Sequence, residues 1–205
     1  MGNRMILLLL CCFLTGKIIA QNFEGEIRYQ NKFEGKMIAV EMIEKLVGNE
    51  LDYYIKEGKY KNYSNGSYMT YQVYDDQTNR LYNKFPKSDT LFYYDGAENA
   101  DSVTRIEHLN NADTVLGYPC DVVIITSKTS ISRYAYSKKF PMNAAAYKKH
   151  AYANWNTYGN ATHAVPLKIT VDSKYYKFTS TATAITPKKL SDQIFTIEGP
   201  TAKMK

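Results

Sequence analysis

Cysteine is scarce in this 205-residue chain, and the positions of the three cysteines exclude a disulfide-stapled fold. Cys11 and Cys12 lie in the first 20 residues, and Cys120 is the third. A lone cysteine after residue 20 cannot form an internal disulfide. We therefore expect a hydrophobic core to hold the fold together.

Long apolar runs are confined to the N-terminus. Arg4 is followed by an uncharged apolar run over residues 5–14, and the small residue Ala20 comes six positions later. This order is typical of a cleavable export signal, and the run is about half of the ~20 residues that a membrane span needs. We predict a signal peptide over 1–20 and no transmembrane span. A single soluble domain over 21–205 would then work in the periplasm or outside the cell.

Lipid attachment at Cys12 is the alternative fate of this N-terminal segment. Lipidation needs a small residue just before the modified cysteine, whereas Cys11 follows Leu10 and Cys12 follows another cysteine. Both cysteines also lie inside the apolar run rather than after it. We therefore favour cleavage near Ala20 over a lipid anchor.

The chain lacks any strong excess of charge of one sign. Removal of Arg4 and Lys17 with the signal peptide lowers the formal net charge from +6 to +4, and the remaining basic residues are dispersed. Binding to nucleic acid usually requires a clustered basic surface. We therefore predict no nucleic-acid partner.

Recognisable catalytic and metal-binding motifs are missing as well. Cys120 as a nucleophile would need a base, and His108, His150 and His163 are the only histidines. None stands at a spacing typical of a cysteine enzyme or a zinc site, and there is no glycine-rich phosphate loop. We predict no catalytic residues, no metal and no cofactor, so an enzyme dependent on Cys120 is the least favoured hypothesis.

Alternation of apolar and polar residues is the dominant pattern that is present. In the segment 23–30, apolar and polar residues alternate without exception. Asn65-Gly66 is a sequence typical of a β-hairpin turn. Many of the 19 tyrosines fall in such segments, where a half-buried sheet suits them. The spacing predicts one large antiparallel sheet, with strands over residues 23–30, 51–55, 59–64, 68–73, 80–85, 90–94, 101–109, 121–127, 131–137, 167–171 and 175–185.

Two segments depart from strand patterning. In 36–47, Ile38, Met42 and Leu46 recur four residues apart, and Gly48 is placed to cap a helix. We predict a short helix there, with a strand over 38–42 as the alternative. The alanine-rich segment 144–155 predicts a second short helix or a helical loop.

Four short motifs occur in a familiar order: 23–29, 54–60, Leu116-Gly117-Tyr118-Pro119-Cys120, and 165–169. With them the chain resembles the uncharacterised secreted proteins of Bacteroidota, including the GLPGLI-type group, that are thought to share the LolA-like lipoprotein-carrier fold. The resemblance covers nearly all of residues 21–205. It implies a mainly β fold, a curved antiparallel half-barrel with one or two short helices on the concave side. In carriers of this fold the concavity holds acyl chains, and no catalytic residues are known.

These observations predict that the chain is a binding protein, which holds a lipid or another apolar ligand in its concavity. The methionine-bearing segment 37–47 would act as a lid that repacks around the guest, although an ordinary core helix has the same pattern. The other hypothesis is a structural protein with a filled core that acts through its surface on an envelope protein partner. The residues expected to line the ligand are Met37, Val40, Met42, Ile43, Leu46, Tyr53, Ile55, Met69, Tyr71, Leu167 and Ile169.

Overall fold

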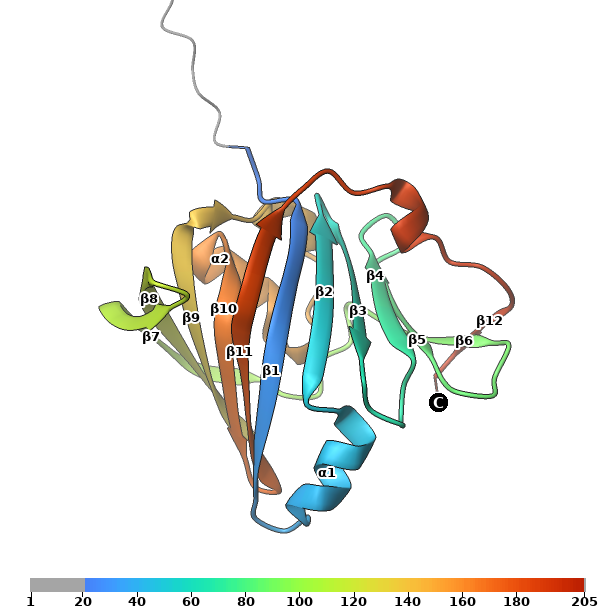
Figure 1. Cartoon of the computed structure of the whole chain (residues 1–205), viewed down its shortest axis with the longest axis horizontal. Coiled ribbons are helices and arrows are strands. Elements are labelled where there is room, and N and C mark those ends of the chain that lie inside the picture. The colour runs from blue at the N-terminus through green and yellow to red at the C-terminus, as the bar shows by residue number, and fades with distance from the viewer. Residues whose placement is uncertain (1–20, 205) are drawn as a thin grey trace, which may run out of the picture.

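One twelve-stranded sheet dominates the structure, a computed structural model that describes residues 21–204 (Figure 1). The predicted signal peptide, 1–20, lies outside the described residues. The spatial order of the strands is β12-β6-β5-β4-β3-β2-β1-β11-β10-β9-β8-β7. Their bounds are β1 Gly25–Gly35, β2 Glu50–Lys56, β3 Lys59–Ser64, β4 Tyr71–Asp75, β5 Arg80–Lys84, β6 Leu91–Asp95, β7 Val103–Val115, β8 Tyr118–Ser127, β9 Ser130–Pro141, β10 Ala164–Ser173, β11 Tyr176–Pro187 and β12 Thr201–Lys203.

Antiparallel pairing joins every pair of neighbouring strands except one. Strands that follow each other in the sequence are neighbours in the sheet, except for β6 with β7 and β11 with β12. The pairing of β1 with β11 brings the first strand beside a strand close to the C-terminus, in the middle of the sheet. The exception is β12, which pairs in parallel with β6. The predicted mainly β class with one curved antiparallel sheet is confirmed, and β12 is the strand that sequence patterning missed.

Strand β1 shows why these residues form a sheet that has one buried face. Ile27 and Tyr29 are buried and Arg28 between them is exposed, because alternate residues of a strand point to opposite faces. The pairing with β11 shifts by one residue between Arg28 and Tyr29, a bulge that adds local twist. We call the face on which Ile27 and Tyr29 lie the inner face of the sheet.

Short helical segments pack against the inner face. The 3-10 turns η1 (Ala144–Tyr147) and η2 (Tyr152–Asn154) lead into helix α2 (Trp155–Thr162), which lies behind strands β9 to β11 in Figure 1. The segment 144–155, predicted as a helix or helical loop, thus forms two turns, and its helix continues to Thr162. A third turn, η3 (Asp192–Phe195), lies in the C-terminal segment.

Helix α1 (Val40–Val47) occupies a different place from the one predicted for it. It begins four residues later than expected, and Gly48 ends it with a positive φ of 86° and an N–H bonded to the carbonyl of Glu44. Figure 1 shows α1 beyond the ends of β1 and β2, at the rim of the sheet. Ile43 is its only buried residue, so α1 does not cover the concave face.

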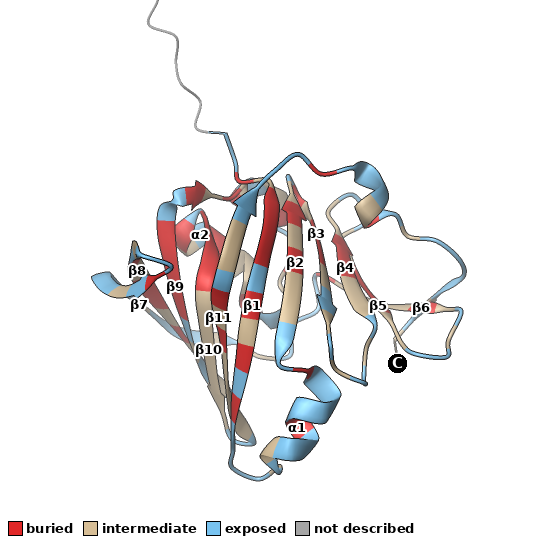
Figure 2. Cartoon of the chain, in the orientation of Figure 1, coloured by how far each residue is buried: buried red, intermediate tan, exposed pale blue. Residues whose placement is uncertain are grey.

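Two hydrophobic clusters lie on opposite faces of the sheet, and Figure 2 shows how the buried positions are distributed along the strands. The larger cluster joins the inner face to residues 142–158 and includes Tyr147 and Tyr158, both fully buried. The smaller one lies on the outer face of β4 to β6, where Leu190 and Phe195 of the C-terminal segment cover Val73. The curved sheet therefore has a separately packed outer layer at one end.

Candidate ligand site

A half-open recess lies on the inner face, between the middle strands and the start of α2. Its volume is about 170 Å³. Six neighbouring strands, from β4 across to β10, contribute to its floor, and Trp155 of α2 forms part of its wall. The lining residues are Tyr29, Leu51, Tyr53, Tyr60, Asn62, Gln72, Trp155, Pro166, Ile169 and Ser180.

Aromatic rings form one wall of this recess. Tyr53 stacks on Tyr60 with 5.4 Å between ring centroids, and Tyr60 stacks in turn on Tyr74 at the same distance. The Trp155 ring lies 6.0 Å from that of Tyr60 and 5.2 Å from that of Tyr158. Rings at these separations attract one another beyond the effect of burial alone. The wall is therefore held in place by its own packing, without a ligand.

Polar side chains extend from the recess across the inner face. The amide of Asn62 donates to Gln72 Oε1 at 3.3 Å, and the amide of Gln72 donates to Asn83 Oδ1 at 2.8 Å. On the other side, the hydroxyl of Tyr29 donates to the carbonyl of Pro166 at 2.6 Å. These groups satisfy one another, so they fix the shape of the recess.

No residue that lines the recess carries a formal charge at neutral pH. Burial raises the pKa of Tyr53 and of Tyr60 well above the ordinary value for tyrosine, so both phenols stay protonated. The site is therefore electrically neutral, with apolar walls and a small number of hydroxyl, amide and indole groups. Such a surface suits an uncharged guest.

The structure brings only two of the eleven predicted lining residues into the recess, Tyr53 and Ile169. Ile55 and Leu167 are buried in the inner cluster without lining the recess. Tyr71 packs with the outer cluster, on the opposite face of the sheet, and Met69 is half-buried in the loop before β4. The remaining five lie in or just before α1, away from the recess: Met37, Val40, Met42, Ile43 and Leu46.

Sequence reasoning missed Trp155, Ser180 and the amide side chains. Trp155 belongs to the segment predicted to be helical, but nothing in the sequence shows which side of a short helix faces a sheet. Ser180 lies in the threonine-rich strand β11, where it pairs with Asn31 of β1. Its place in the recess follows from strand register, which alternation within one strand does not specify.

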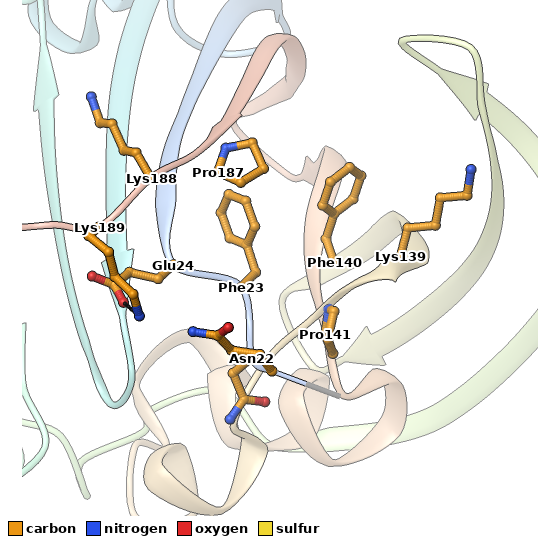
Figure 3. A pocket seen from close by; sticks show the side chains of 10 residues that line it. Asn22, Phe23, Glu24, Lys139, Phe140, Pro141, Pro187, Lys188 and Lys189 are labelled. Carbon is orange, nitrogen blue, oxygen red and sulfur yellow. Dashed lines mark hydrogen bonds and ion pairs between the residues drawn. The ribbon is translucent and has the colours of Figure 1, made fainter. Parts of the chain in front are cut away.

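A larger depression of about 380 Å³ lies at the end of the sheet where β1 begins (Figure 3). Phe23 and Phe140 form its apolar part, with ring centroids 5.6 Å apart, and lysine side chains extend outward from it. Two of these lysines are paired: Lys188 with Glu26 at 2.5 Å and Lys189 with Glu24 at 3.0 Å. Because its lining is charged and two of its three lysines are already paired with glutamates, the depression is a weaker candidate for an uncharged guest than the recess.

Cys120 does not have the surroundings of a reactive thiol. It is fully buried, and its Sγ donates to the carbonyl of Tyr118 at 3.3 Å rather than to a histidine. Burial raises its pKa, which disfavours the nucleophilic thiolate. Within residues 21–204, no group of three or more acidic, histidine or cysteine side chains is arranged to hold a metal ion.

The helices of the described region are all short. None within residues 21–204 is long and apolar enough to cross a membrane.

Comparison with known proteins adds a family and two structural neighbours. The sequence model of a family described as "Domain of unknown function (DUF4412)" matches residues 33–199. No curated protein matches the chain.

Among solved structures, PNGF-II is similar, with a TM-score of 0.53 and 13% identity over 89% of this chain and 31% of that one. This chain therefore spans about a third of that protein, and at such low identity the likeness shows the fold alone. A LolA superfamily protein from Nitrosomonas europaea aligns with a TM-score of 0.44 and 9% identity, over 86% of this chain and 91% of that one.

Proposed function

We propose that this chain, which belongs to the DUF4412 family, is an exported, non-enzymatic binding protein that holds an apolar group in the inner-face recess. The observation that carries the proposal is the recess itself, a neutral and largely apolar cavity framed by six strands and Trp155. Export rests on the signal pattern of residues 1–20.

The size of the recess limits what it holds. Sites for drug-sized ligands have volumes of roughly 300–1,000 Å³, whereas this recess has about 170 Å³. It accommodates a small apolar molecule or the end of one acyl chain, and the rest of a larger lipid would remain outside. Affinity would come from apolar burial, at about 25 cal/mol per Å², offset by the entropy lost on association.

The chain provides a built-in reporter for this proposal. Trp155 is the only tryptophan, and it lines the recess. A titration with small apolar compounds should give a saturable change in tryptophan fluorescence, and native mass spectrometry should detect the bound compound. Ile169→Trp would fill the recess and should abolish the binding that native mass spectrometry detects, which is the readout for this variant because it adds a second tryptophan. Met42→Ala, on the exposed helix α1, should leave both readouts unchanged.

A protein that never takes up an apolar compound in either experiment would contradict the proposal. The second candidate is then an interaction protein that acts through its surface in an envelope complex. The observation in its favour is that buried residues of 142–158 already pack against the inner face. It predicts that Ile169→Trp leaves complex formation intact, because the outer surface of the protein is unchanged.

A further inference from the structure

Unpartnered polar atoms are concentrated around the recess. Among the described residues, five buried side-chain polar atoms have no hydrogen-bond partner. Three of them are on residues that line the recess: the hydroxyl of Tyr53, the indole N–H of Trp155 and the hydroxyl of Ser180. A fourth is Oδ1 of Asn31, whose backbone pairs directly with Ser180 across β1 and β11.

Such a concentration needs a physical explanation. A buried polar group without a partner costs about 1–3 kcal/mol, so native proteins contain few of them. Tyr53 and Ser180 are 8% and 1% exposed, so bulk water does not solvate their hydroxyls. A guest molecule in the recess that supplies partners would recover this energy, because the protein has already lost the hydration of these atoms.

The chemistry of the three atoms on lining residues defines the partner that they need. The indole N–H of Trp155 only donates, so it requires an acceptor on the ligand. The hydroxyls of Tyr53 and Ser180 both donate and accept, so they are satisfied by a ligand group that has an acceptor and also a hydrogen to donate. No charged side chain lines the recess, so a carboxylate or ammonium group would be buried without a counter-ion at a high energetic cost.

We infer that the ligand carries an uncharged group that both donates and accepts hydrogen bonds, of the primary amide or alcohol class, next to its apolar part. This inference rests on the proposed binding function and narrows it from any apolar guest to a neutral amphiphile. Tyr53, Trp155 and Ser180 recognise the polar group, and Leu51, Ile169 and the tyrosine rings contact the apolar part.

Four ligands with six carbon atoms each test this inference: hexanamide, hexanol, hexane, and hexanoate at a pH where it is ionised. Each is titrated against the purified protein, with Trp155 fluorescence and calorimetry as readouts. We expect the amide and the alcohol to bind about tenfold more tightly than hexane or hexanoate, a ratio worth about 1.4 kcal/mol. The double variant Tyr53→Phe with Ser180→Ala should reduce this ratio toward one while hexane binding persists.

The matched control is Tyr136→Phe, which removes the hydroxyl of another buried tyrosine that does not line the recess. In this variant the amide and the alcohol should still bind about tenfold more tightly than hexane or hexanoate. If hexane and hexanoate bind as tightly as the amide and the alcohol, water satisfies the polar atoms and the inference fails while the binding function stands. If none of the four binds, the proposed function itself fails.

Discussion

His150 is a titratable side chain in the core whose pKa connects stability to pH. It is fully buried, its Nε2 lies 2.8 Å from the hydroxyl of Tyr60, and its ring stacks on Tyr74 at 3.9 Å. Burial lowers the pKa of His150 from 6.5 to about 3, because the interior disfavours the charged ring. The folded protein therefore holds His150 neutral, whereas the unfolded chain takes up a proton below pH 6.5.

The pH dependence of stability follows from that difference. The lowered pKa means that the contribution of His150 is present above pH 6.5 and is lost as the pH falls toward about 3. We expect the free energy of unfolding to decline with a slope that approaches about 1.4 kcal/mol per pH unit below 6.5. Chemical denaturation at a series of pH values measures it. The same slope in the variant His150→Gln would show that another group is responsible.

Two neighbouring tyrosines offer a matched test of hydrogen-bond satisfaction. The hydroxyl of Tyr29 donates to the Pro166 carbonyl, whereas that of Tyr53 has no partner among the described residues. Tyr29→Phe should lower the free energy of unfolding by about 1–3 kcal/mol because it leaves a buried carbonyl unpaired. Tyr53→Phe should be neutral or stabilising in urea denaturation without ligand. Equal losses in both variants would mean that Tyr53 is also bonded.

At the level of secondary structure, helix α1 has one buried anchor and an exposed apolar side. Ile43 is 5% exposed, whereas Met42 beside it is 57% exposed. Ile43→Ala should therefore lower the free energy of unfolding by about 2 kcal/mol, and Met42→Ala should change it by less than about 0.5 kcal/mol. Thermal denaturation of the two variants measures the difference. A lid role for α1 would instead require Met42→Ala to weaken ligand binding.

Strands were more predictable from the sequence than the positions of helices. Residues 23–30 and 167–171 alternate in the way that is typical of a strand, and β1 and β10 lie there. β12 is three residues long and has no alternation of its own, so its pairing with β6 depends on tertiary contacts. The apolar side of α1 indicated a helix correctly but not its location, because periodicity shows that a side is apolar without showing what covers it.

The candidate site was predictable only in part, for the same physical reason. Tyr53 lies among the lining residues, because alternation in β2 places it with Ile55 on the buried face. Tyr71 has the same kind of pattern in β4, but both faces of that strand are covered, and it packs with the outer cluster. A single alternating strand does not show which of two buried faces holds a ligand.

At the scale of the whole molecule, the C-terminal segment covers the outer face of the sheet at β4 to β6. Glu24, beside the start of β1, accepts the backbone N–H of Leu190 at 2.6 Å and pairs with Lys189 at 3.0 Å. The bond to Leu190 is the main cause of the lowered pKa of Glu24. Lys56 of β2 donates to the carbonyl of Leu190 at 3.0 Å, so the segment is fixed to two strands before it reaches the outer cluster.

The two clusters should therefore be separable by mutation. Phe195 is 5% exposed in the outer cluster, on the other side of the sheet from the recess. Phe195→Ala should lower the free energy of unfolding by about 3 kcal/mol, yet the folded variant should bind hexanol with unchanged affinity. Ile169→Trp should have the opposite pattern of effects: it should abolish the binding of hexanol and change the free energy of unfolding little. Because a rigid sheet separates the two faces, a loss of hexanol binding in folded Phe195→Ala would show that the outer layer shapes the recess.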